Sequence, residues 1–181
     1  MLFAYIMFVV TKWGGNVILD LKSVYISEGA TLPVNFELDM SDMAFGGINP
    51  ITKPVAVSGS VYNRAGIVTV DVLCEVEFSA PCDRCGKNAT KNHGINIKRV
   101  LVSQLADKTD DEIIEVPDLQ LDVSELAVTE IVLSLPMKHL CKEDCKGICQ
   151  TCGKDLNDGP CDCNHAQVDP RLEVLAQLLK H

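Results

Sequence analysis

The feature that most limits how this chain can fold is a cluster of cysteines late in the sequence. Six cysteines lie within residues 141–163, and two more form the pair Cys82 and Cys85. Core packing gives no reason for such a density of cysteine, whereas thiolates at these short spacings can converge on one tetrahedral metal ion. The rest of the chain is therefore best interpreted as a scaffold that brings these cysteines together.

Two of the cysteine pairs share one motif, Cys-x-x-Cys-Gly. Cys85 is followed by Gly86, and Cys152 is followed by Gly153. In such a turn, backbone N–H groups hydrogen-bond to sulfur, and glycine adopts the left-handed conformation that closes the turn. Four-sulfur sites suit zinc, which needs no redox partner. Two such motifs in one chain predict zinc binding more strongly than either alone.

The cysteines divide into two groups of four once Cys74 is set aside as a core residue. We expect a turn at residues 157–160 to close a first zinc site, made of Cys149, Cys152, Cys161 and Cys163. A second zinc ion would be held across a large loop, by Cys82, Cys85, Cys141 and Cys145. An alternative division places one ion on Cys141, Cys145, Cys149 and Cys152. His93, His139 and His165 are spare nitrogen ligands. His139 and His165 lie close enough in sequence to substitute in a site, but the thiolates complete both sites, so these two are expected to face solvent.

Other chemistries fit the motifs less well. The spacing of Cys145, Cys149 and Cys152 matches the iron–sulfur ligands of radical enzymes, but those enzymes need a large barrel that 181 residues do not supply. An iron–sulfur cluster of another kind remains an alternative. A redox pair at Cys82 would need a helix after it, and a strand is predicted there. The chain has no phosphate-binding loop and no nucleophile or metalloprotease motif, so we predict that it is not an enzyme.

The start of the chain bears on its compartment. Residues 1–10 are apolar but lack a basic start and a cleavage site, and they are too short to span a membrane. Residues 13–17 can be encoded as a purine-rich ribosome-binding site followed by a GUG codon. We therefore expect residues 1–16 to be a mis-called leader, with a signal peptide as the alternative. The predicted location is the reducing cytoplasm, where clustered cysteines indicate metal or redox chemistry.

Alternating apolar residues predict an α+β fold, mainly an antiparallel β-sheet or partial barrel, with a cysteine-rich zinc-binding segment and a terminal helix. A four-residue connection, Asn63 to Gly66, should join the longest strands into a hairpin. Cys74 lies on the apolar side of the second of these strands. Ser124 is the expected cap of a helix that runs to Leu135. The expected strands are residues 17–26, 32–38, 55–62, 67–78, 94–105 and 119–123.

The predicted organisation has four parts, defined by composition and by the cysteines. They are the leader at 1–16, a β-rich core with one helix at its end at 17–135, the cysteine-rich zinc-binding segment at 136–165, and an amphipathic helix packed on the core at 166–181. Asp169 and Pro170 supply the cap and first turn of that last helix.

The net charge limits the partners. The formal charge is −9, which argues against broad contact with the phosphates of RNA. An acidic connector at residues 107–118 is either a solvated loop or a surface that attracts a basic protein. A nucleic-acid-binding zinc ribbon is therefore the less favoured interpretation.

Several segments together resemble the bacterial YceD family of large ribosomal RNA subunit accumulation proteins. They are Cys82-Asp-Arg-Cys85 after a long strand, Leu135-Pro-Met-Lys138, the run from Leu140 to Gly153, residues 154–163, and Asp169-Pro-Arg-Leu172. The chain is similar to a cysteine-rich branch found in clostridia-like bacteria, and the resemblance covers residues 17–181. His139 departs from it, since similar proteins often carry proline or another apolar residue there.

The resemblance implies a non-enzymatic role in accumulation or processing of 23S rRNA and in assembly of the large ribosomal subunit. It carries over no catalytic residue. Other branches lack most of these cysteines, which makes two structural zinc ions the expected role of the sites. The expected partner is a ribosomal precursor, reached through a basic ribosomal protein or assembly factor, with direct RNA contact left open and with no membrane or small-molecule substrate. The alternative function is a zinc- or redox-responsive cysteine protein.

Overall fold

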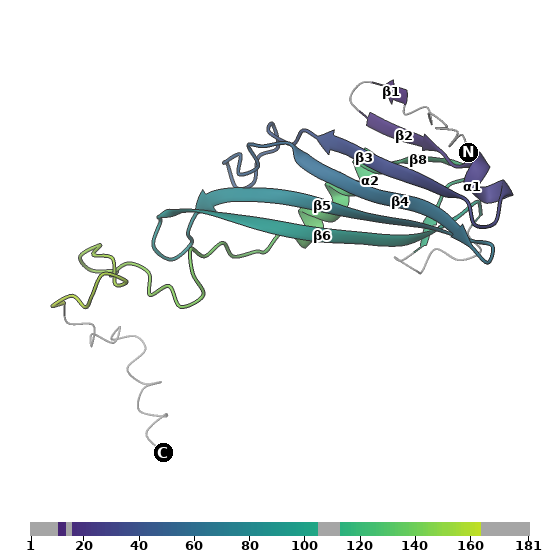
Figure 1. The fold of residues 1–181 in the computed structure, drawn as a ribbon. Helices are drawn as coiled ribbons and strands as arrows, with labels where there is room; N and C mark the ends of the chain where they lie inside the picture. The colour runs from purple at the N-terminus through teal and green to yellow at the C-terminus, as the bar shows by residue number, and fades with distance from the viewer. Residues whose placement is uncertain (1–10, 14–15, 105–112, 164–181) are drawn as a thin grey trace, which may run out of the picture. The chain divides into compact units, whose positions relative to one another are not determined.

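The computed structural model describes residues 11–13, 16–104 and 113–163 (Figure 1). The chain divides into two compact units, and each is described by itself. The first, called the sheet unit, comprises residues up to Ala80 together with Ala89–Lys138. The second, called the cysteine unit, comprises Pro81–Asn88 and the chain from His139 onward.

The sheet unit is built mainly on a five-stranded sheet in the order β3-β4-β5-β6-β7. Strands β3, β4 and β5 pair antiparallel, β5 and β6 run in opposite directions in Figure 1, and the short β7 pairs parallel to β6. A three-stranded antiparallel sheet, β1-β2-β8, completes the described strands. The expected fold class, mainly antiparallel β with few helices, is confirmed. The strands are β1 (Thr11–Trp13), β2 (Asn16–Asp20), β3 (Thr31–Leu38), β4 (Val55–Arg64), β5 (Ile67–Pro81), β6 (Asn88–Val102), β7 (Ile113–Glu115) and β8 (Gln120–Asp122).

The core lies along one face of β5, as its period-two pattern predicts. All six predicted inward positions of this strand are buried, and Cys74 among them has no exposed surface. Burial raises the pKa of the Cys74 thiol to about 11, with the nearby Glu130 carboxylate adding to the effect. A thiol with this environment behaves as a small apolar side chain, which confirms its assignment to the core. The six positions are Val68, Val70, Val72, Cys74, Val76 and Phe78.

The β4–β5 hairpin turns more tightly than expected. Arg64 pairs with Ile67, so the connection has only two residues, Ala65 and Gly66, at φ 52° and 80°. Positive φ at both central residues matches the right-handed twist of the strands. Asn63 belongs to β4, where its buried amide accepts from Gly66 N–H at 3.1 Å and donates to the carbonyl of Val24 at 2.8 Å. The four-residue connection was therefore a wrong expectation.

The strand expected over residues 17–26 is only half right. Strand β2 ends at Asp20, and helix α1 (Lys22–Ile26) follows. The Asp20 carboxylate accepts from Lys22 N–H at 3.0 Å, a local bond that favours the change of direction. The buried side chain of α1 is Val24. Alternation across five residues did not distinguish this short helix from a strand.

Helix α2 (Val123–Ser134) begins two residues before the predicted helix and has a different cap. Asp122, not Ser124, accepts from the N–H of Glu125, at 3.0 Å. Ser124 is buried instead, and its hydroxyl accepts from the backbone N–H of Val17 at 2.8 Å. The serine therefore ties α2 to β2.

The remaining expectations differ in their boundaries or lie outside the described residues. Strand β6 begins at Asn88 rather than at residue 94, because β5 extends to Pro81 and the two strands pair beyond the apolar stretch. Residues 1–10 and 14–15 of the expected leader, residues 107–112 of the acidic connector and the expected helix at 166–181 are outside the described residues. Among the described helices, none is long and apolar enough to cross a membrane.

Candidate metal centres

The cysteine unit contains two turns with one hydrogen-bond pattern, here called the first knuckle (Cys82–Lys87) and the second knuckle (Cys149–Lys154). In each, the N–H of the first cysteine donates to the carbonyl five residues on, at 2.9 Å and 2.8 Å respectively. The glycine N–H donates back to the carbonyl of that cysteine, at 2.8 Å and 2.9 Å. Gly86 and Gly153 both have φ of 72°, the left-handed conformation that the motif predicts.

The knuckles aim backbone N–H groups at sulfur. In the second knuckle, Thr151 and Cys152 donate to the Cys149 sulfur at 3.3 Å and 3.4 Å. The N–H groups of Cys152 and then Thr151 lower the pKa of Cys149 to about 6. The backbone N–H of Cys141, outside the first knuckle, and then those of Cys85 and Arg84 within it lower the pKa of Cys82 to about 6. Backbone N–H groups thus stabilise one thiolate in each group of cysteines without a cation.

Each knuckle contributes to a group of four thiols whose sulfur atoms all lie within 4.8 Å of one another. The Cys82 and Cys145 sulfurs are 3.8 Å apart, and those of Cys85 and Cys141 are 3.7 Å apart. Zinc–sulfur bonds of about 2.3 Å in a tetrahedron give sulfur–sulfur edges of about 3.8 Å. A disulfide would need about 2.05 Å. The groups are site one, Cys149, Cys152, Cys161 and Cys163, and site two, Cys82, Cys85, Cys141 and Cys145.

The structure therefore brings together the two sets of four cysteines that the preferred division named, and it does not form the alternative set. Cys141 and Cys145 lie with the first knuckle, roughly sixty residues upstream, rather than with the second. All nine cysteines are free thiols.

In each group of four cysteines, burial and the neighbouring thiols make it harder for all four to ionise. Burial and the neighbouring thiols of site two raise the pKa of Cys141 to about 12. In site one, the Cys152 thiol and then burial raise the pKa of Cys163 to about 12. Four adjacent thiols therefore do not all lose their protons at neutral pH unless a cation compensates the charge. A divalent ion that prefers sulfur, such as zinc, fits both groups.

The two sites differ in exposure. In site two, Cys82, Cys85 and Cys145 are buried and Cys141 is half-buried. In site one only Cys149 is buried, while Cys152 is exposed and Cys161 and Cys163 are half-buried. A ligand or oxidant from solvent can therefore approach the sulfur atoms of site one more easily.

His139 is buried, with 6% of its surface exposed, so the expectation that it faces solvent was wrong. Its backbone pairs with the first knuckle: Asp83 N–H donates to the His139 carbonyl at 2.8 Å, and His139 N–H donates to the Asp83 carboxylate at 2.6 Å. These bonds hold the chain that leads into Cys141 against the first knuckle. His93 is half-buried against Phe78 in the sheet unit, and His165 is outside the described residues.

Sequence reasoning missed the polar residues that surround site two. Arg84 donates to the carbonyl of Cys145 at 2.8 Å, and Lys87 forms an ion pair with Asp155 at 2.7 Å. The side-chain amide of Asn157 donates to the Cys145 sulfur at 3.5 Å. In the sequence Asn157 reads only as a turn residue, and no spacing rule pairs it with Cys145.

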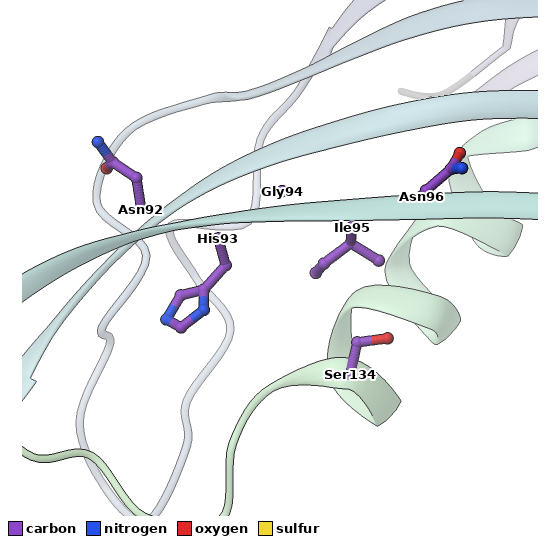
Figure 2. Close-up of a pocket in the computed structure, with 6 residues that line it drawn as sticks. All are labelled: Asn92, His93, Gly94, Ile95, Asn96 and Ser134. Carbon is purple, nitrogen blue, oxygen red and sulfur yellow. The ribbon is translucent and has the colours of Figure 1, made fainter. Parts of the chain in front are cut away.

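The sheet unit also has an open pocket beside the end of α2, with a volume of about 420 Å³ (Figure 2). His93 is the only ionisable side chain among the residues that line it. Its lining residues are Asn92, His93, Gly94, Ile95, Asn96 and Ser134.

Comparison with known proteins places these features in a family. The family described as "Large ribosomal RNA subunit accumulation protein YceD" matches residues 70–179, which include all eight site cysteines. The YlbN protein of Bacillus subtilis is 31% identical over 130 residues, covering 71% of this chain and 76% of that protein. An uncharacterized protein of Mycobacterium tuberculosis is 34% identical over 70 residues, covering 39% of this chain and 33% of that protein.

A plant relative carries a functional name. The chloroplastic "Large ribosomal RNA subunit accumulation protein YCED homolog 1" of Arabidopsis thaliana is 23% identical over 159 residues, covering 71% of this chain and 50% of that protein. No solved structure matches. The family match spans more than half of the chain, and the Bacillus relative is covered over most of its length. This chain therefore belongs to the YceD family of large ribosomal RNA subunit accumulation proteins.

Proposed function

We propose that this protein is a non-catalytic factor for accumulation and processing of 23S rRNA and for assembly of the large ribosomal subunit. The observation that carries the proposal is the family match over residues 70–179. The name of the Arabidopsis relative supports the same role.

The cysteine unit would be held by two structural zinc ions. Each site offers four protein sulfurs, which complete a tetrahedron and leave no coordination position for a substrate or a reactive water. The chemistry that zinc would supply is therefore cross-linking of chain segments, including the distant first knuckle. We place the protein in the cytoplasm because free thiols and thiolate-bound zinc persist in a reducing compartment.

The partner on the ribosomal precursor would be a basic protein. The chain carries a formal charge of −9, and the side of β5 opposite to the core carries Asp71, Glu75 and Glu77. Phosphates would be repelled by this surface, whereas a basic ribosomal protein or assembly factor would be attracted. We expect association with precursor particles to weaken as salt concentration rises, because exposed charges are screened.

The decisive experiment for the ribosomal role is removal of the gene. We expect the strain to show less mature 23S rRNA relative to 16S rRNA and an accumulation of large-subunit precursors, measured by primer extension and sucrose gradients. Expression of the wild-type chain should restore the ratio. Unchanged precursor and mature levels after deletion would contradict the proposal.

Native mass spectrometry with metal analysis tests the zinc assignment. We expect two zinc ions in a colourless protein purified without added metal, one on each group of four cysteines. A single zinc per chain would show that one site does not fill. A brown protein with absorption in the visible range would indicate iron instead.

The second candidate function, a zinc- or redox-responsive protein, is favoured by one observation. Cys152 of site one is exposed, which gives oxidants access to a sulfur ligand. This function requires that mild oxidation release zinc and also change association with the ribosomal precursor. Zinc release with unchanged association would leave only the structural role.

A further inference from the structure

The loop between the second knuckle and Cys161 belongs to site one by sequence but makes its contacts with site two. We call residues 154–158 the linking loop. It lies between Cys152 and Cys161, so both flanking ligands belong to site one. Its side chains and backbone reach the chain around Cys145, which is a ligand of site two.

Asn157 makes the most direct of these contacts. Its side-chain oxygen accepts from the backbone N–H of Lys146 at 2.9 Å, which fixes the orientation of the amide. The nitrogen of the same amide is thereby aimed at the Cys145 sulfur at 3.5 Å and at the Asp155 carboxylate at 2.7 Å. A hydrogen bond from an amide N–H to sulfur favours the charged form of that sulfur. Asn157 thus stabilises a thiolate of the other site.

Two further contacts hold the linking loop in place. Leu156 N–H donates to the Gly147 carbonyl at 2.9 Å. Lys87 of the first knuckle forms an ion pair with Asp155 at 2.7 Å. The side chain of that aspartate is only 15% exposed, so the pair is partly shielded from water. The loop therefore contacts the surroundings of site two in two places, at residues 145–147 and at Lys87 of the first knuckle.

The chain at Gly147 is packed too closely for a side chain. This glycine has φ of 76°, and a Cβ atom there would lie 3.0 Å from the carbonyl oxygen of Arg84. Ile148 N–H donates to the same oxygen at 3.2 Å. The segment 145–148 is thus bonded to the first knuckle and to the linking loop, so a shift of the loop is transmitted to Cys145.

We propose that the two metal sites are thermodynamically coupled, with Asn157 acting as a positioning residue for site two from within the loop that site one closes. Metal in site one orders residues 152–161, and the ordered loop presents the Asn157 amide to the Cys145 thiolate. The inference rests on the proposed zinc binding. Coupling is reciprocal, so metal in site two also raises the affinity of site one.

The magnitude follows from the chemistry of metal ligands. Loss of a hydrogen-bond partner to a ligand costs about 10- to 100-fold in metal affinity. We therefore expect Asn157→Ala, which keeps all eight cysteines, to weaken zinc binding at site two by about tenfold. The matched control is Lys154→Ala, in the same loop, whose ammonium contacts the carbonyl of Pro160 rather than site two.

The experiment measures zinc affinity at each site in the full-length protein. A chromophoric chelator sets the free zinc concentration, and alkylation of unprotected cysteines, read by peptide mass, reports each site separately. Cys145 reports site two and Cys152 reports site one. The variants are Asn157→Ala, the double variant Cys161→Ser with Cys163→Ser, and all three changes combined. Circular dichroism checks that each variant keeps its sheet.

Coupling predicts a non-additive result. The double cysteine variant should weaken site two although it leaves the four ligands of site two intact, and Asn157→Ala should add little in that background. An equal effect of Asn157→Ala with and without site one would make Asn157 a purely local partner and overturn the coupling. Unchanged site-two affinity in Asn157→Ala would do the same. If zinc binds without coupling, the proposed structural role of zinc remains and the coupling is wrong. If the wild-type chain binds no zinc, both proposals are wrong.

Discussion

At the scale of single residues, Gly59 shows how closely neighbouring strands can limit a position. It lies in β4 opposite Val72 of β5, and a Cβ atom built on it would fall against the Asp71 carbonyl and 2.6 Å from the Val72 Cα. Backbone atoms of a central strand do not move aside as a flexible side chain would. Glycine is therefore required at position 59 because there is no room for a Cβ atom, and not because the chain turns there.

We predict that Gly59→Ala lowers the free energy of unfolding by about 3 kcal/mol, the upper range for overpacking. Urea denaturation followed by circular dichroism measures it. Gly94→Ala in β6 is the matched control, because its Cβ would meet only the Leu73 side chain at 3.7 Å, an ordinary contact. Equal losses for the two variants would show that crowding at Gly59 is relieved by local movement.

Cys74 gives a second residue-scale prediction, which concerns thiol reactivity. Its pKa is raised to about 11, so at pH 8 only about one molecule in a thousand carries the reactive thiolate. In native protein treated with a zinc chelator at pH 8, an alkylating reagent should modify the exposed Cys152 and spare Cys74.

The native reactivity of Cys74 should rise only as pH approaches 11, because the thiolate form that reacts becomes populated there. Denaturant should expose it at any pH. Mass spectrometry of the alkylated peptides reads the outcome. Modification of Cys74 as fast as Cys152 in the folded protein would contradict its burial.

At the scale of elements, the two knuckles have the same pattern of backbone hydrogen bonds but differ in how deeply their cysteines are buried. Three ligands of site two are buried, whereas only Cys149 of site one is. A chelator or an oxidant removes zinc by reaching a sulfur or the ion itself. The same local motif should therefore give sites of different lability.

We predict that a strong chelator removes zinc in two phases, with site one emptied first. Time-resolved native mass spectrometry should show a one-zinc species in which Cys152 is alkylated and Cys145 is protected. Cys152→Ser should remove the phase that belongs to site one and leave a single phase, the release of zinc from site two. Loss of site-two zinc first, or of both ions in one phase, would contradict the order.

Local signals predicted some elements and failed for others, for identifiable reasons. The period-two pattern of β5 predicted its buried face because one side of that strand packs entirely into the core. The same reasoning failed at α1, where five residues are too few for alternation and helical spacing to differ. It also failed at Ser124, because the hydroxyl is used by Val17, far away in sequence.

At the scale of the whole molecule, the two units depend on different forces. The sheet unit has an extensive cluster of buried apolar side chains that includes none of the eight site cysteines. The described part of the cysteine unit has a second cluster, formed by Cys82, Cys85 and Cys145 with Leu140 and Cys141 against it. Such a small cluster does not offset the entropy of ordering the chain, so the cysteine unit should depend on metal.

We predict that zinc removal unfolds the cysteine unit and spares the sheet. Hydrogen exchange of the full-length protein in chelator should lose protection at Cys82–Lys87 and at residues 139–163, while β4 and β5 keep theirs. Re-addition of zinc should restore protection. Loss of protection in β4 and β5 on zinc removal would show that the metal stabilises the sheet as well.

The sequence by itself predicted the local geometry of the candidate metal sites. Cysteine spacing and the following glycines predicted the two knuckles, because both depend on a few adjacent residues whose geometry is local. The motifs around Cys82 and Cys149 also predicted the family, and alternation predicted a mainly antiparallel sheet.

Only the tertiary structure decided which cysteines meet and which polar groups serve them. Spacing left two divisions open, since either could satisfy a tetrahedral ion, and the choice depends on chain closure over roughly sixty residues. The burial of His139 and the contact of Asn157 with Cys145 arise from how separate segments pack. A local sequence pattern cannot predict such contacts, because they form between residues that are distant in sequence and meet only in the folded protein.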